Sequence, residues 1–73
     1  MEASKIKMIS KDFRKAQEIA LSLTSEGYHI ERYASLYDEI IFLLHHENGN
    51  RMRVVAKSGK TYLFKNGKIV KIV

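Results

Sequence analysis

Apolar residues between positions 11 and 26 recur at spacings of three and four, which is the period of an α-helix. Charged and polar side chains fill the opposite arc, so one face of this helix is predicted to pack and the other to stay in water. Ser10 is expected to cap the N-terminus of the helix, and Gly27 to end it. We therefore predict an amphipathic helix over Lys11–Glu26, preceded by a short edge strand over Lys5–Ile9. The apolar positions of the helix are Phe13, Ala16, Ile19, Ala20 and Leu23.

After Gly27 the pattern changes from helical to alternating, and β-branched and aromatic residues become frequent. Asn48-Gly49 and Asn66-Gly67 are strong signals for tight hairpin turns, and Ser58-Gly59 is a third turn candidate. The predicted strands are Tyr28–Tyr33, Glu39–Glu47, Arg51–Lys57, Lys60–Lys65 and Lys68–Val73. The fold class is therefore α+β: one domain over residues 1–73, with the helix packed on a five-stranded antiparallel meander.

The second predicted strand contains an uninterrupted apolar run, Ile40–Leu44. A strand with one wet face should alternate, whereas this one would bury both sides. We expect something to cover the second face of the sheet: the sheet curls into a small barrel, or a second subunit packs on it. In the second case the protein is a small interaction domain, a homodimer or an inhibitor, whose interface contains Ile40, Phe42 and Leu44.

The register of the hairpin at Asn48-Gly49 stays open at this point. A two-residue turn places Leu43 and His45 on the same face as Met52, whereas a three-residue loop with a bulge places Leu44 there instead. The choice decides which half of the apolar run faces the helix.

A chain of 73 residues has material for one small core, and the absence of cysteine excludes disulfides and thiolate metal sites. Small domains compensate by oligomerisation when disulfides and metals are missing. The sequence shows neither the apolar segment of a signal peptide nor a run of about twenty apolar residues that could cross a membrane. We expect a cytoplasmic protein without contact to a membrane.

The distribution of charge is lopsided. All eight acidic residues precede position 48, so residues 1–47 carry a net charge of −2 and residues 48–73 a net charge of +7. Surplus positive charge of this kind is typical of proteins that bind nucleic acids or other polyanions. Lysines on outer strands also protect sheet edges from pairing with other chains, which is the alternative interpretation.

Alternation places Arg51, Arg53 and Lys57 on one face of the third strand. In the last hairpin Tyr62, Phe64, Ile69 and Lys71 are expected to share a face. Aromatic rings beside cations are what single-stranded nucleic acid requires, because rings stack on bases and cations hold phosphates. We predict a non-enzymatic module that binds RNA, DNA or another anionic partner. Its predicted contact residues are Arg51, Arg53, Lys57, Lys60, Lys65, Lys68, Lys71, Tyr62 and Phe64.

We find no motif for catalysis, a cofactor or a metal. The string Ser58–Thr61 resembles the end of a phosphate-binding loop, but a strand rather than a helix follows it, so we interpret it as a turn. His45 and His46 are adjacent and would point to opposite faces of a strand. His29 and Glu47 do not complete a convincing ligand set with either of them.

Overall fold

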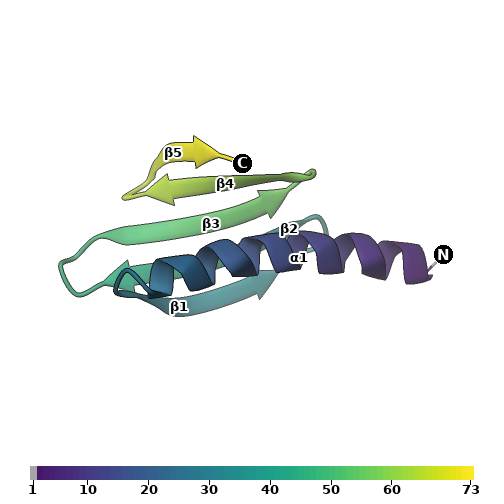
Figure 1. Ribbon diagram of the computed structural model, residues 1–73. Helices are drawn as coiled ribbons and strands as arrows, with labels where there is room; N and C mark the ends of the chain where they lie inside the picture. Colours follow the sequence, from purple (N-terminus) through teal and green to yellow (C-terminus); the bar gives the residue numbers. More distant parts are fainter. Residues whose placement is uncertain (1) are drawn as a thin grey trace.

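The computed structural model describes residues 2–73, with side chains from residue 13 onward. One helix is followed by five strands, which form a single antiparallel sheet in the order β1-β2-β3-β4-β5 (Figure 1). The elements are α1 (Glu2–Thr24), β1 (Tyr28–Ser35), β2 (Glu39–His46), β3 (Arg51–Lys57), β4 (Lys60–Lys65) and β5 (Lys68–Ile72). The predicted α+β meander is confirmed. The sheet stays open, with β1 and β5 as its edges, so the barrel alternative is wrong.

Helix α1 begins earlier than its apolar pattern predicts. Lys5–Ile9, expected to form an edge strand, lies within α1, and so does Ser10, the expected N-cap. The segment from Glu2 to Ser10 contains no glycine or proline that would stop a helix, and its alanine, lysines and methionine favour one. The helix therefore continues through a stretch whose isoleucines suggested a strand.

The C-terminal end of α1 is closed by two backbone hydrogen bonds. The N–H of Glu26 donates to the carbonyl of Leu23 at 2.9 Å, and the N–H of Gly27 donates to that of Thr24 at 3.1 Å. Gly27 has a φ of 99°, a backbone conformation that residues with a Cβ rarely adopt. The chain reverses here and enters β1 directly.

The core lies between α1 and strands β1, β2 and β3. Even-numbered residues of β2 and β3 point toward the helix, and Leu44 and Val54 are 1% and 0% exposed. The ring of Phe13 extends this core toward β1, with its centroid 5.6 Å from that of Tyr33 and 6.0 Å from that of Phe42. The buried apolar residues are Ala16, Ala20, Leu23, Tyr28, Ile40, Phe42, Leu44, Met52, Val54 and Ala56.

The β2–β3 hairpin has a three-residue loop, Glu47–Gly49. The N–H of His46 donates to the carbonyl of Asn50 at 2.8 Å, and Leu44 pairs with Met52. Of the two registers left open by the sequence, the longer loop is therefore the one formed. It sends Ile41 and Leu43 to the side of the sheet away from α1.

We call that side the open face. No segment of residues 2–73 packs across it, because the only helix lies on the opposite side of the sheet (Figure 1). Strands β4 and β5 also extend past α1, and every residue of β5 is exposed. The sheet therefore offers one uncovered surface that spans all five strands.

Candidate binding surface on the open face

Four of the seven predicted cations lie on the open face. Arg51, Arg53 and Lys57 point away from α1 because Met52, Val54 and Ala56, which alternate with them along β3, are buried beneath the helix. Lys60 joins them because it pairs with Lys57 across the β3–β4 turn. The predicted grouping of the β3 cations is confirmed.

The other three cations lie on the side of the sheet that carries α1. Lys65 pairs with Met52 on β3 and with Lys68 on β5, and both contacts place it on the helix side. Lys71 pairs with Leu63 and lies there as well. The seven predicted cations therefore do not form one surface.

The position of Lys71 differs from the sequence prediction. The pairing of β4 with β5 shifts between Leu63 and Phe64, so that Phe64 pairs with Ile69 but Tyr62 pairs with Ile72. An irregularity of this kind reverses the alternation of every later residue in the strand. Ile72 consequently takes the place beside Tyr62 on the open face that was predicted for Lys71.

Tyr62 and Phe64 are half-buried on the open face, next to the β3 cations. The guanidinium carbon of Arg53 lies over the ring of Phe64, 4.2 Å from its centroid. Such a cation–π contact contributes about 0.5–1 kcal/mol at an exposed site. Both predicted stacking residues thus lie where a ligand on the open face would meet them.

A shallow groove of about 530 Å³ crosses the middle of this surface. Its apolar lining comes from Ile41, Val55, Tyr62, Phe64 and Ile69. Arg53 and Lys57 supply positive charge at its sides, and the Nζ of Lys57 lies 3.7 Å from a carboxylate oxygen of Glu39. The open face therefore combines an apolar floor with a cationic margin.

The predicted interface residues Ile40, Phe42 and Leu44 are buried in the chain's own core beneath α1. The three-residue hairpin loop is the reason, because it turns this half of the apolar run toward the helix. These side chains are not available to a partner. The apolar side chains that β2 contributes to the open face are Ile41 and Leu43.

An acidic residue that the sequence did not single out also reaches the open face. The β1–β2 register shifts between Ile30 and Arg32, and the extra residue, Glu31, places its Oε1 3.4 Å from the Nδ1 of His45. A bulge of this kind reverses the alternation of the residues that follow it. Alternation along β1 already groups Glu31 with His29. The bulge changes the face of the next residue, Arg32, which pairs with Leu43 and therefore also lies on the open face.

His45 and His46 point to opposite faces of the sheet, as predicted. His46 faces the helix side, where its ring contacts that of Tyr28 at 5.0 Å, whereas His45 lies on the open face near His29, with ring centroids 5.6 Å apart. Within residues 13–73 no three His, Asp or Glu side chains are grouped so that they could hold a metal ion.

Ser58 and Gly59 form the β3–β4 turn and Thr61 is buried in β4, so the segment Ser58–Thr61 does not have the structure of a phosphate-binding loop.

In the part of the chain that the structure describes, no helix is long and apolar enough to span a membrane. Comparisons with known proteins find no family model, no curated protein and no solved structure that matches this chain. Function must therefore be inferred from the chemistry of the surface itself.

Proposed function

We propose that the protein is a non-enzymatic binding module that holds single-stranded nucleic acid on the open face of its sheet. The observation that carries the proposal is the gathering of two aromatic rings and four cations on one uncovered surface. Cations bind the phosphates of any sequence, and each aromatic ring can stack on an unpaired base. The residues concerned are Arg51, Arg53, Lys57, Lys60, Tyr62 and Phe64.

A single strand fits this surface better than a duplex. Tyr62 and Phe64 stand in the floor of a shallow groove, and in a double helix the bases are stacked on each other and cannot reach them. On the β1 side of the open face the charge of Arg32 is offset by that of Glu31, whereas β3 and β4 carry the two aromatic rings and four cations, so the strand is expected to follow β3 and β4.

The test is the salt dependence of affinity for single-stranded RNA and DNA of about 12 nucleotides, measured by fluorescence anisotropy. If the four cations of β3 and β4 on the open face contact phosphates, the slope of log K against log salt concentration between about 50 and 200 mM is about −3, because each contact on a single strand contributes about −0.7.

The chain offers a matched control for this measurement. Lys57 and Lys60 face each other across the β3–β4 turn on the open face, and Lys65 and Lys68 face each other across the β4–β5 turn on the helix side. The double variant Lys57→Gln/Lys60→Gln is expected to flatten the slope by about 1.4, whereas Lys65→Gln/Lys68→Gln, with the same net charge, leaves it unchanged. Absence of binding at the lowest salt, or equal losses in both double variants, would overturn the proposal.

A homodimer through the open face is the second candidate, favoured by the apolar side chains that nothing in the chain covers. Charge opposes it, because the open face carries five cations but only the acids Glu31 and Glu39, so two copies packed face to face would bring two net positive surfaces together. Light scattering decides: a dimer that Leu43→Glu converts to a monomer would support this candidate, and a monomer at high protein concentration would exclude it.

A further inference from the structure

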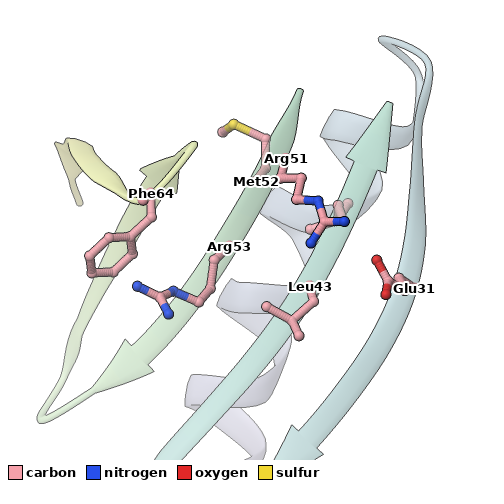
Figure 2. Close-up of a pocket in the computed structure, with 8 residues that line it drawn as sticks. Glu31, Leu43, Arg51, Met52, Arg53 and Phe64 are labelled. Atoms are coloured by element: carbon pink, nitrogen blue, oxygen red, sulfur yellow. The ribbon is translucent and has the colours of Figure 1, made fainter. Parts of the chain in front are cut away.

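A pocket of about 180 Å³ lies on the open face, beside the groove. Its volume is comparable with that of a single nucleobase. The side chains that give it chemical character are Glu31, Leu43, Arg51, Arg53 and Phe64 (Figure 2). They come from four strands, so the sheet itself fixes their spacing.

One side of the pocket is a flat stacking surface. The guanidinium carbon of Arg53 lies 4.2 Å from the centroid of the Phe64 ring, and both residues line the pocket. Arginine guanidinium planes stack on unpaired bases as aromatic rings do. With Leu43 on β2 as apolar floor, this side suits a planar ring without selecting among the bases.

The other side of the pocket carries opposite hydrogen-bonding groups. Figure 2 shows Arg51 extending from β3 over β2, toward the part of the pocket where Glu31 stands on β1. These two side chains form no ion pair with each other, although both line the pocket. A ligand between them would meet guanidinium donors on one side and carboxylate acceptors on the other.

The acceptor, Glu31, lies at the irregularity in β1 and is not saturated. Glu31 is the extra residue of the β1 bulge, and its Oε1 lies 3.4 Å from the Nδ1 of His45. The Nδ1 of His45 is buried without a hydrogen-bond partner, so the 3.4 Å contact between them is not a hydrogen bond. The carboxylate of Glu31 can therefore accept hydrogen bonds from a ligand.

From this arrangement we propose that the pocket is a base-specific subsite for guanine within the bound strand. An unpaired guanine presents N1–H and N2–H side by side, which suits bidentate bonding to the Glu31 carboxylate. Its O6 and N7 are the acceptors to which an arginine such as Arg51 donates two hydrogen bonds. Cytosine and adenine each offer a carboxylate only one exocyclic amino group, and uracil only one N–H, so none of them satisfies both residues equally.

The proposal rests on the function proposed above, and the experiment separates the two. Short oligouridines with one central guanosine, inosine, adenosine or cytidine are titrated with the wild-type protein at low salt. The guanosine oligomer is expected to bind at least about fivefold more tightly than the adenosine oligomer, the lower limit for a good bidentate contact. Inosine keeps O6, N7 and N1–H but lacks the 2-amino group, so it should lose most of this preference.

Two variants test whether Glu31 causes the preference for guanosine. Glu31→Gln preserves the shape of the side chain but cannot accept two hydrogen bonds from one base edge, and it should abolish the preference for guanosine over adenosine. Glu18→Gln makes the same change of charge at an exposed position of α1, and it should retain the preference. Equal binding of all four oligomers, or a guanosine preference that survives in Glu31→Gln, would overturn the guanine subsite and leave the proposed function standing. If no oligomer binds at all, the proposed function itself fails.

Discussion

The side chain of Asn66 joins the β4–β5 turn to the start of β3 at Arg51. Its Oδ1 accepts a hydrogen bond from the backbone N–H of Arg51 at 2.9 Å, and its own backbone N–H donates to the carbonyl of Arg51 at 2.9 Å. Its Nδ2 also donates to the Oδ1 of Asn50 at 3.2 Å. Asn66 adopts a φ of 51°, which asparagine tolerates better than most residues. The turn is thereby tied to the strand that carries the open-face arginines.

This link predicts an order of stability among variants at position 66. Asn66→Asp keeps the acceptor for Arg51, Asn66→Gly keeps only the backbone freedom, and Asn66→Ala loses both. We expect the alanine variant to cost about 1–2 kcal/mol of unfolding free energy, the glycine variant less, and the aspartate variant least. Urea denaturation followed by circular dichroism measures the series, and alanine and glycine variants of equal stability would contradict the role of the backbone conformation.

The adjacent leucines of β2 test the hairpin register directly. Leu44 is 1% exposed beneath α1, whereas Leu43 lies half-buried on the open face. Leu44→Ala should cost about 2–5 kcal/mol because it leaves a cavity in the core, and Leu43→Ala only about 1 kcal/mol. Thermal or urea unfolding of both variants gives the comparison. The reverse order would mean that the shorter turn had formed and that the faces were exchanged.

Among the chain's glycines, Gly27 is predicted to be the one whose replacement by alanine destabilises the protein most. A Cβ at this position would lie 2.6 Å from the Nε2 of His46, whereas a Cβ on Gly67, which has a similar φ, would meet nothing. Gly67→Ala should therefore show only the backbone cost of about 1–2 kcal/mol, and Gly27→Ala about 1 kcal/mol more.

A double-mutant cycle isolates that extra cost at Gly27. In a His46→Ala background the steric conflict is absent, so Gly27→Ala and Gly67→Ala should become equally destabilising. An additive cycle would show that the imidazole moves aside without cost.

The stacking residues make a separate prediction about affinity. Phe64→Leu keeps an apolar side chain on β4 but removes the ring beneath Arg53. The dissociation constant for single-stranded oligonucleotides should rise at least about fivefold, because base–aromatic stacking contributes about 1–3 kcal/mol per base. Tyr37→Leu removes a highly exposed ring from the β1–β2 connection and should leave affinity unchanged. Similar losses in both variants would argue against stacking on the open face.

Much of the fold could be predicted because its signals are local. Between Tyr28 and Val73 the alternation of apolar and polar residues predicts the strands, and the residue types of Asn66-Gly67 and Ser58-Gly59 predict the turns. The start of α1 could not be placed, because Lys5–Ile9 suits a helix as well as a strand. The loop length at Asn48-Gly49 was equally undetermined, since both registers satisfy the apolar pattern of β2.

The candidate site was harder to predict than the fold because it depends on pairing between strands. Alternation along β3 grouped Arg51 with Arg53, as the structure confirms. It could not reveal the shift between β4 and β5 that moves Lys71 to the helix side, or the bulge that moves Arg32 to the open face. Such irregularities arise where two strands meet, and neither strand's own sequence records them.

Strand β5 has a consequence for how this protein can change. Each of its five residues is exposed, and the buried core is built from α1 and the strands up to β4. Substitutions in β5 therefore cost little folding free energy, while Ile69 and Ile72 stand at the border of the open face. Ligand preference can diverge through this last strand at almost no risk to folding, so it is a natural place for variation between lineages and for directed evolution in the laboratory.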